Sequence, residues 1–579
     1  MINLKIDNKE ISVPEGTTIL EAARQANIDI PTLCYLKKVN EIGDCRMCIV
    51  EVEGRKGFAT SCIQKVEEGM VVHTHTPDVL EARKMVLDLI ISNHAKDCLT
   101  CIRNGNCELQ ALAIKFNVLD VEYEGERTKH KIDDKSPAIV RDFNKCVLCR
   151  RCVGVCKNIQ NVGAIDCINR GFEACVSTAG DHSLADVDCT FCGQCIEACP
   201  TGALHEKDDT KKVWIKLKDP DVYTVVQTAP AVRVALGEEF GMPIGTNVQG
   251  KMITALRRLG FDKVFDTNTG ADLTIMEEAN EFIDRLNGKA VLPMITSCSP
   301  GWVRFAEKNY PELLDHLSSC KSPHQMFGAI IKSYYAQKFN VDPSKIYVVS
   351  VMPCIAKKYE CTREEMEVDG LRDVDAVITT RELSRMIKQG NIEFNKLEDS
   401  EFDDPMGEAT GAGAIFGTTG GVMEAALRTA SDILEGKNLE KVEYEEVRGK
   451  EGIKKATLTI AGKDVNIAVA SGLKVARQIM EEIKSGKAEY HFIEIMACPG
   501  GCVMGGGQPI KSSKIRSTVD VRKLRADSLY SIDEASTIRK SHQNPTIIKL
   551  YKEFLEKPGS KVAHKYLHTT YSKKEKYNI

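Results

Sequence analysis

The chain has 579 residues, of which 43% are hydrophobic, an ordinary globular content that is sufficient for several cores. A formal net charge of -4, from 78 basic and 82 acidic residues, predicts no nucleic-acid partner, because such partners normally require a concentrated basic face. No apolar run of about 18 residues occurs, and the alternating N-terminus lacks the apolar core of a signal peptide. We therefore expect no membrane span and a cytoplasmic protein.

The chain contains 23 cysteines. Cytoplasmic thiols are kept reduced, so these residues are not interpreted as a disulfide framework, and their spacing is typical of metal ligands. Seventeen cysteines lie between residues 34 and 199, and six lie between 298 and 502. This division indicates electron-transfer centres in the first third of the chain and a reactive site in the remainder.

Residues 1–78 are predicted to form a small iron-sulfur domain. Residues 2–6 and 11–13 favour a hairpin, and Thr18 is placed to cap a helix over 19–26. Four cysteines follow with 10, 2 and 13 residues between them, namely Cys34, Cys45, Cys48 and Cys62. Their order resembles that of plant-type 2Fe-2S ferredoxins with an enlarged first loop. Zinc bound by four thiolates is the alternative.

Residues 79–125 begin with an amphipathic helix that leads into a second group of ligands. His94 and Cys98 are four residues apart, which predicts that they share a helix face, and Cys101 and Cys107 follow. Three cysteines need a fourth ligand, and the imidazole of His94 is the only soft donor nearby. We expect a 4Fe-4S cluster on these four residues, with zinc as the alternative.

Residues 126–209 contain the most specific local pattern. The spacing C-x2-C-x2-C-x3-C occurs over 146–156 and again over 189–199, as in bacterial two-cluster ferredoxins, where the fourth cysteine of each run binds the other cluster. One 4Fe-4S cluster is therefore expected on Cys146, Cys149, Cys152 and Cys199, and a second on Cys156, Cys189, Cys192 and Cys195. A pair of zinc ribbons is the alternative. Cys167 and Cys175 lie outside the spacing and are interpreted as small buried residues.

Residues 210–579 alternate between strands and helices, which predicts an α/β domain with largely parallel sheets. Strands are expected over 222–227, 263–266, 289–295, 345–352, 375–379 and 489–495, and helices over 250–259, 274–286, 381–388 and 421–430. Three of these strands end in cysteine loops, which carry Cys298, then Cys354, then Cys498 with Cys502. The third loop contains five glycines, which we expect to let the backbone approach an inorganic cluster. Open α/β sheets place their sites at strand ends, so these loops predict a metal site.

The three loops span residues 296–302, 352–360 and 494–509. Together with the accessory motifs they make the whole chain resemble the monomeric clostridial-type [FeFe]-hydrogenases. The resemblance implies a multidomain α+β fold, in which ferredoxin-like iron-sulfur domains precede a large α/β domain with parallel sheets, residues 210–579, that holds the H-cluster. The H-cluster is a 4Fe-4S cubane joined by one cysteine to a diiron unit with CO, cyanide and azadithiolate. The implied reaction is the reversible reduction of protons to H₂.

The same resemblance implies roles for individual residues. Cys354, Cys498 and Cys502 are expected to bind the cubane, with Cys502 as the bridge to the diiron unit. Lys357 is expected to contact a cyanide, which suits a compact charged donor. The residues expected to pack around the diiron unit are Met352, Met496, Phe416, Pro230 and Ala231. The implied proton path falls on Cys298, Glu278, Ser318, Glu281 and Arg285, and a thiol pKa near ~8.5 suits its first member.

The first loop departs from the family pattern, which has two adjacent cysteines where this chain has Cys298 and Ser299. Counting from the other loops places Ser299 at the fourth cubane position. Three interpretations are open: Ser299 binds iron as an alkoxide, or the loop shifts so that Cys298 binds and Ser299 relays protons with water, or the cubane is labile. His324 and Ala231 also stand where the family has glutamine and serine, and Cys320 is a spare thiol.

The resemblance implies a ferredoxin or flavodoxin as redox partner, diiron maturation enzymes for assembly, and a monomer. Three alternatives are kept: a non-catalytic iron-sulfur assembly or electron-transfer relative, a subunit of a bifurcating or NAD(P)-linked complex or a hydrogen sensor, and a zinc-ribbon binding module. The glycines of residues 411–417 fail the GxGxxG pattern at its last position, so no nucleotide site is predicted on this chain.

Overall fold

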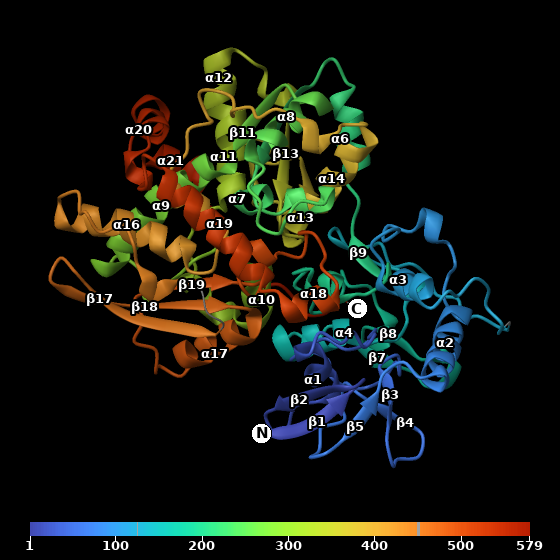
Figure 1. The fold of residues 1–579 in the computed structure, drawn as a ribbon. Coiled ribbons are helices and arrows are strands. Elements are labelled where there is room, and N and C mark those ends of the chain that lie inside the picture. Colours follow the sequence, from blue (N-terminus) through green and yellow to red (C-terminus); the bar gives the residue numbers. More distant parts are fainter. Residues whose placement is uncertain (124, 449–451, 579) are drawn as a thin grey trace.

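The structure is a computed structural model that describes residues 1–123, 125–448 and 452–578. The N-terminal region, in blue, lies beside a larger region in which an upper lobe and a lower-left lobe each contain one four-stranded sheet (Figure 1). Among the described residues, none of the helices combines the length and the apolar character that a membrane crossing requires.

The first domain is built on a five-stranded sheet of order β2-β1-β5-β3-β4. Its strands are β1 Ile2–Ile6, β2 Lys9–Val13, β3 Ile49–Val52, β4 Phe58–Thr60 and β5 Val71–His73. The predicted hairpin is confirmed, since β1 and β2 pair antiparallel. The predicted helix is also confirmed as α1, Ile19–Gln25, and the Thr18 side chain accepts a hydrogen bond from the Glu21 amide.

The next segment consists of α2, Pro77–Ser92, a short 3-10 turn over Cys98–Thr100, and α3, Glu108–Lys115. The prediction that His94 and Cys98 share a helix face is wrong. The helix α2 ends at Ser92 with Asn93 as its cap, so His94 lies beyond it and Cys98 begins a separate turn. Asparagine favours helix ends over helix interiors because its side chain competes for backbone hydrogen bonds, which explains the early stop.

The two-cluster segment shows the same backbone twice. Leu148 and Arg150 in the first run, and Phe191 and Gly193 in the second, all have positive φ. Each pair leads into a short helix, α4 Arg151–Gly154 and α5 Gln194–Ala198. Two antiparallel strand pairs complete the segment: β6 Ile139–Arg141 with β9 Leu204–Glu206, and β7 Asp166–Ile168 with β8 Cys175–Ser177. The repeated spacing of the sequence therefore becomes a repeated fold.

Two four-stranded sheets form the large region. The first has the order β11-β10-β13-β16 and is entirely parallel, with β10 Tyr223–Thr228, β11 Lys263–Asp266, β13 Ile346–Met352 and β16 Ala376–Thr379. The second has the order β12-β19-β18-β17, with β12 Met294–Ile295, β17 Ile453–Ile460, β18 Lys463–Ser471 and β19 Phe492–Met496. Only β17 runs antiparallel. The predicted α/β architecture with parallel sheets is confirmed.

Helices cover both sheets and fill the space between the lobes (Figure 1). They are α6 Thr210–Leu217, α7 Pro230–Arg233, α8 Gln249–Leu259, α9 Thr267–Leu286, α10 Pro300–Asn309, α11 Pro323–Ile330, α12 Ala336–Phe339, α13 Ala356–Glu360, α14 Thr380–Gln389, α15 Gly411–Ile415, α16 Gly421–Glu435, α17 Leu473–Lys484, α18 Ser513–Thr518, α19 Val521–Ala535, α20 Pro545–Leu550 and α21 Lys561–Leu567. The most apolar positions of β13 and β19 are buried on both faces, as expected for strands between helical layers.

Two boundaries and one hairpin differ from the predictions. The strand expected over 289–295 is reduced to β12, because Pro293 cannot donate to the ladder and Val291 is exposed. The helix expected from residue 274 begins at Thr267, where Asp266 caps it, so its first two turns were missed among threonines and a glycine that favour helices weakly. The hairpin of β17 and β18 was not predicted, although its strands are among the longest in the fold.

A buried ion-pair cluster joins α16 to α19. Arg428 donates to both carboxylate oxygens of Asp533 and to Glu424, at 2.8 Å each, and all three side chains are fully buried. We expect Arg428→Met to lower the unfolding free energy of this region by about 3 kcal/mol, because it removes the fully buried cation that Glu424 and Asp533 share. Urea unfolding followed by tryptophan fluorescence and circular dichroism measures the change.

The matched control is Lys523→Met on the same helix α19, where the Lys523–Asp527 pair lies on the surface. This variant should leave the unfolding midpoint unchanged, since exposed pairs contribute little. Equal midpoints for the two variants would contradict a structural role for the buried cluster.

Candidate metal centre at the strand ends

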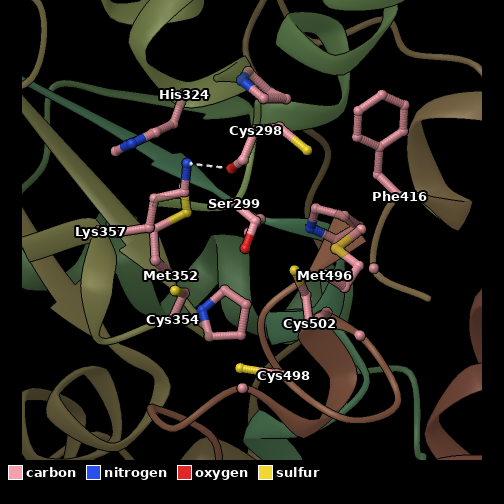
Figure 2. Close-up of a pocket in the computed structure, with 18 of the residues that line it drawn as sticks. Cys298, Ser299, His324, Met352, Cys354, Lys357, Phe416, Met496, Cys498 and Cys502 are labelled. Atoms are coloured by element: carbon pink, nitrogen blue, oxygen red, sulfur yellow. Dashed lines mark hydrogen bonds between the residues drawn. The ribbon is translucent and has the colours of Figure 1, made fainter. Parts of the chain in front are cut away.

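A single cavity lies where the carboxyl ends of the two parallel sheets meet. Most of its lining comes from the ends of four strands and the segments that follow them: Pro230 and Ala231 after β10, Cys298 and Ser299 after β12, Met352, Cys354 and Lys357 at and after the end of β13, and Met496, Cys498 and Cys502 at and after the end of β19. Phe416 and His324 complete the lining. Figure 2 shows these side chains around the cavity. Strand ends of two sheets thus bring together loops that are far apart in the sequence, as the rule for α/β sites predicts.

Three thiols and one hydroxyl face the same part of this cavity. Figure 2 shows the Ser299 hydroxyl pointing toward the side that carries Cys354, Cys498 and Cys502. That hydroxyl accepts a hydrogen bond from the Ala497 amide at 3.2 Å, which fixes its direction. Burial first, and then the neighbouring Cys354 thiol, raise the pKa of Cys498 well above its ordinary value. Buried thiolates so close together need a cationic partner, so the donor set fits an iron-sulfur cubane.

Cys298 points in another direction. Its thiol lies on the Phe416 side of the cavity in Figure 2, away from the other three thiols. Burial, and then the nearby Glu278 carboxylate, raise the pKa of Cys298 well above its ordinary value. The two adjacent side chains of the first loop therefore separate, with Ser299 toward the thiols and Cys298 toward the predicted proton path. The indole of Trp302 donates to the Thr296 carbonyl at 3.1 Å and holds the loop in this arrangement.

A buried charged network lies beside the cavity. The Lys357 ammonium donates to Glu360 at 2.8 Å and to the Cys298 carbonyl at 3.1 Å. Burial alone would raise the pKa of Glu360, but Lys357 and His324 outweigh it and lower that pKa to about 2. Burial and then Lys357 lower the pKa of His324 to about 4, so the imidazole is neutral. Glu360 is consequently the counter-ion that fixes the Lys357 side chain at the cavity wall.

The neutral His324 uses both of its ring nitrogens away from the cavity. Nε2 lies 2.5 Å from the Glu360 carboxylate, which can only accept, so this nitrogen carries the proton. Nδ1 lies 3.1 Å from the Ser350 hydroxyl and accepts from it. Ala231 has no hydrogen-bonding group in its side chain. Neither His324 nor Ala231, which stand where the family has glutamine and serine, therefore offers a side-chain donor to the cavity.

The glycines of the third loop have a packing role that the sequence did not predict. A side chain at Gly505 would collide with the Pro353 carbonyl, one at Gly506 with the backbone of Gly193, and one at Gly507 with Thr379. Gly500 and Gly501 have positive φ. These glycines let three protein loops pack against one another and so position the thiols, while Gly501 and Gly505 also line the cavity, where the predicted approach to an inorganic cluster stays a prediction.

The residues predicted for the proton path lie on and beside α9. Ser318 donates to Glu281 at 2.9 Å, and Arg285 donates to the other Glu281 oxygen at 2.6 Å. Both oxygens of Glu278 are buried without a hydrogen-bond partner among the residues that the structure describes. Burial, and then Glu281, raise the pKa of Glu278 to about 8. Glu278 therefore holds a proton near neutrality and lies between Cys298 and the Glu281 cluster.

The four cysteines of the first domain come together. The Cys34 amide lies 3.3 Å from the Cys45 sulfur, and the Cys45 amide lies 3.5 Å from the Cys34 sulfur. The hydrogen bond with the Cys62 thiol lowers the pKa of Cys48 to about 7. This mutual arrangement of four thiols fits a 2Fe-2S cluster, in which backbone amides donate to the sulfurs.

The predicted ligands of residues 79–125 are more exposed than those of the first domain. His94 is buried with its Nδ1 atom unpartnered among the described residues, whereas Cys98 is exposed and Cys101 and Cys107 are half-buried. Burial lowers the pKa of His94, which favours the neutral imidazole that binds metals. A buried ring nitrogen without a partner is the atom that a cluster iron would satisfy. Gly202 approaches the Cys101 sulfur closely and connects this set to the next one.

Two further cavities separate the eight cysteines of the repeated runs. One is lined by Cys146, Cys149, Cys152 and Cys199, and the other by Cys156, Cys189, Cys192 and Cys195. This is the crossed grouping that the two-cluster spacing requires. Of the two cysteines outside the runs, Cys175 is buried as expected, whereas Cys167 is only half-buried.

The two-cluster segment contacts the main cavity directly. Gln194 donates to the Met504 carbonyl at 3.0 Å, and Gln160 donates to the Ala497 carbonyl at 2.9 Å. The Cys192 thiol is near enough to contribute to the raised pKa of Cys498, after burial and Cys354. The accessory cysteines thus lie next to the strand-end thiols, although the two sets are far apart in the sequence.

Sequence reasoning missed several residues that shape the site. Glu494 accepts from the Gly420 and Met423 amides at 2.7 Å each and fixes the start of α16. Gln508 donates to the Ala231 carbonyl at 2.8 Å. Both residues lie within the third loop motif, residues 494–509, and their place in that motif was the only sequence feature that pointed to them. Cys320 and His568 lie beside Glu281, and nothing in the spacing indicated that the C-terminus returns to this point.

Comparison with known families covers most of the chain. Residues 222–506 match the family described as iron only hydrogenase large subunit, C-terminal domain, and residues 519–574 match iron hydrogenase small subunit. Residues 1–77 match a 2Fe-2S iron-sulfur cluster binding domain. Residues 83–122 match the NADH-ubiquinone oxidoreductase-G iron-sulfur binding region, and residues 136–205 the ferredoxin-like domain of NADH-quinone oxidoreductase subunit 3.

Individual relatives match at full length. The NADP-reducing hydrogenase subunit HndD of Solidesulfovibrio fructosivorans is 51% identical over 588 residues, covering 100% of both chains. Iron hydrogenase 1 of Clostridium pasteurianum is 46% identical over 576 residues, covering 99% of this chain and 100% of that protein. The solved apo [FeFe]-hydrogenase HydA1 of Chlamydomonas reinhardtii is 40% identical, covers 64% of this chain and all of that one, and has a TM-score of 0.57. The chain belongs to the [FeFe]-hydrogenase family, with accessory iron-sulfur domains before its H-cluster domain.

Proposed function

We propose that this chain catalyses the reversible reduction of protons to H₂ at an H-cluster in the strand-end cavity. The observation that carries the proposal is the joint presence, in one buried cavity, of Cys354, Cys498 and Cys502 with a charged lysine and an otherwise apolar wall. When bound, the H-cluster supplies the iron at which protons and electrons combine. The chain's own residues hold it, exclude water and deliver protons.

The ligand assignment follows the directions of the side chains. Cys354, Cys498 and Cys502 bind the cubane, with Cys502 as the bridge, and Ser299 takes the fourth position because its hydroxyl faces these thiols (Figure 2). The alternative in which Cys298 takes that position requires its thiol to turn away from Glu278. Lys357 remains available to a cyanide, because Glu360 and the Cys298 carbonyl take only two of its three protons. Pro230, Ala231, Met352, Met496 and Phe416 form the dry wall.

The proton path consists of Cys298, Glu278, Ser318, Glu281 and Arg285. Glu278 is the critical member, since its pKa of about 8 lets it give and take a proton near neutrality. Ser318 and Arg285 hold Glu281, whose side chain is 15% exposed and reaches toward the surface. The two glutamates and Arg285 lie on α9, Cys298 follows β12, and Ser318 follows the 3-10 turn Pro311–His316 beside the end of β12.

The electron path runs through four accessory clusters in three segments: one 2Fe-2S cluster in residues 1–78, one 4Fe-4S cluster on His94 and three cysteines in 79–125, and two 4Fe-4S clusters in 126–209. The catalytic domain is residues 210–579. The close approach of the Cys192 loop to the Cys498 loop supports electron transfer between the last accessory cluster and the cubane. We infer a cytoplasmic protein that matures with the diiron maturation enzymes.

Two electron donors are compatible with the proposed function: a ferredoxin or flavodoxin, and the partner subunits of an NADP-linked complex. Ferredoxin or flavodoxin, with the chain acting as a monomer, follows from the resemblance to monomeric enzymes. Full-length similarity to HndD favours a second function, as the hydrogenase subunit of an NADP-linked complex. The glycines of residues 411–417 do not support the second function directly: Gly411 packs against Asp533 and Gly413 against Asn268, so these glycines permit helix contact.

Hydrogen production by the matured, isolated chain tests the proposed function and its electron source. We expect gas chromatography to detect H₂ with reduced ferredoxin or reduced methyl viologen, and none with NADPH alone, because electrons from NADPH need a partner subunit. The chain produced without maturation enzymes is the control. Full accessory clusters without H₂ from either reductant would favour the assembly or electron-transfer alternative.

Ser299 provides a test of the ligand assignment. Ser299→Cys should raise the cubane reduction potential and its resistance to chelators, because thiolate is a softer iron ligand than alkoxide. Ser299→Ala should lower the cubane content. Redox titration followed by electron paramagnetic resonance, with iron analysis, measures both. If Ser299→Ala keeps its cubane while Cys298→Ala loses it, Cys298 is the ligand and the assignment is wrong.

Glu278 provides a test of the proton path. Glu278→Gln should lower turnover by about 10²–10⁴-fold, the usual contribution of a positioned acid or base. The folded-state pKa of about 8 exceeds the ordinary value of 4.5. Wild-type stability is therefore lost as pH rises from about 4.5 through about 8, and the glutamine variant should be relatively more stable at the upper end.

The control is Asp284→Asn on the exposed face of the same helix, where Asp284 pairs with Lys289. It should change neither turnover nor the pH dependence of thermal unfolding. Normal turnover in Glu278→Gln would remove Glu278 from the path.

A further inference from the structure

A second group of metal-ligand side chains lies outside the strand-end cavity. Glu281, Cys320 and His568 each offer one ligand atom, and the three atoms lie within 4.8 Å of one another. Cys320 and His568 are joined by an antiparallel backbone bridge, and α9 brings Glu281 to them. We propose that these three residues bind one Zn²⁺-like divalent cation, and that the bound cation blocks the proton path at Glu281.

The distances suit zinc. The Cys320 sulfur lies 3.9 Å from Glu281 Oε2. Zinc bonds of about 2.3 Å to sulfur and about 2.0–2.2 Å to oxygen, at a tetrahedral angle, require a separation of about 3.5 Å, so a small side-chain rotation completes the site. Arg285 occupies the other oxygen, Oε1, at 2.6 Å. Oε2 accepts from the Ser318 hydroxyl and from the Ser319 amide and hydroxyl, and the cation would take the place of these donors. Carboxylate, thiolate and imidazole together are donors that zinc accepts.

The histidine is already oriented as a ligand. His568 Nε2 lies 3.0 Å from the Glu277 carboxylate, which in turn accepts from the Tyr551 hydroxyl and the Gly559 amide. Nδ1 faces the Ser319 hydroxyl at 2.8 Å. A carboxylate that holds one nitrogen while the other meets the metal is the outer contact that ligating histidines normally have. This arrangement is an observation independent of the triad itself.

Charge and access also favour a cation. With Cys320 as thiolate, the cluster has three negative groups, Glu277, Glu281 and Cys320, which balance Arg285 and one divalent ion. Binding exchanges the Cys320 thiol proton for the metal and releases that proton to solvent, with no change of oxidation state. The exposed His564 ring lies 4.1 Å from the His568 ring, so the site opens toward the surface.

The effect on turnover rests on the proposed function, in which Glu281 relays protons. A metal bound to Oε2 displaces the Ser318 and Ser319 contacts at 2.9 Å and 3.2 Å and removes the atom that would accept a proton. Zinc should therefore slow turnover in both directions while leaving the clusters intact. The binding site itself does not depend on catalysis.

The test uses holoenzyme with full iron content, to which ZnCl₂ or, as a control, MgCl₂ is added. Zinc K-edge X-ray absorption distinguishes the added metal from iron and should show one sulfur at about 2.3 Å with nitrogen and oxygen donors. Equilibrium dialysis should give one tight zinc per chain. Cys320→Ala and His568→Gln should each weaken it by at least about tenfold, since even outer-shell changes typically cost that much.

Cys361→Ala is the matched control, because Cys361 is a buried thiol whose hydrogen bond goes to the Lys358 carbonyl. It should leave zinc affinity and inhibition unchanged. Inhibition by zinc that disappears in Cys320→Ala supports both parts of the proposal. Zinc bound through Cys320 without inhibition would overturn the role of Glu281 in the proton path. Zinc affinity that is unchanged in both Cys320→Ala and His568→Gln would overturn the site.

Discussion

The close packing of the third loop against two others is the constraint on which the site depends. Gly505 approaches the Pro353 carbonyl and Gly506 the backbone of Gly193 so closely that no Cβ atom fits at either position. The first contact sets the Cys502 loop against the Cys354 loop, and the second sets it against the loop of Cys192. One glycine-rich segment therefore fixes both the cubane ligands relative to one another and the last accessory cluster relative to the cubane.

Buried charge gives the cavity its chemical character. Glu360 compensates Lys357, which would otherwise be an isolated ion in an apolar wall, and the neutral His324 completes the hydrogen bonding without adding charge. On the other side, Glu278 has no partner among the described residues and so keeps a proton. The chain thus pairs the charged groups beside the proposed cofactor site, and it leaves the Glu278 carboxyl group on the proposed proton path without a partner.

Cysteine spacing predicted more of the molecule than hydrophobic pattern did. The repeated two-cluster backbone and the three strand-end loops follow from short-range spacing, because ligand geometry constrains neighbouring residues directly. The hairpin of the first domain follows instead from the strand pattern of residues 2–6 and 11–13. The helix face expected for His94 and Cys98 failed because a local cap at Asn93 outweighed the periodicity. The strand over 289–295 failed because Pro293 limited pairing to β12.

Long-range contacts could not be read from the sequence. His568 reaches Glu281 only because the C-terminal segment crosses back over α9, and Glu360 meets His324 only after α11 and α13 have packed. The packing role of the glycines was missed for the same reason, since the loops they touch come from three different parts of the chain. Spacing indicates which residues bind metal, whereas tertiary packing decides which residues surround them.

The infrared spectrum of anaerobically purified protein, coexpressed with the diiron maturation enzymes, tests the H-cluster assignment most directly. Bands from CO and cyanide bound to iron should appear, and they should be absent from protein made without the maturation enzymes. Full iron-sulfur content with no such bands in the matured protein would contradict the assignment and leave a chain that carries electrons or clusters without hydrogen chemistry.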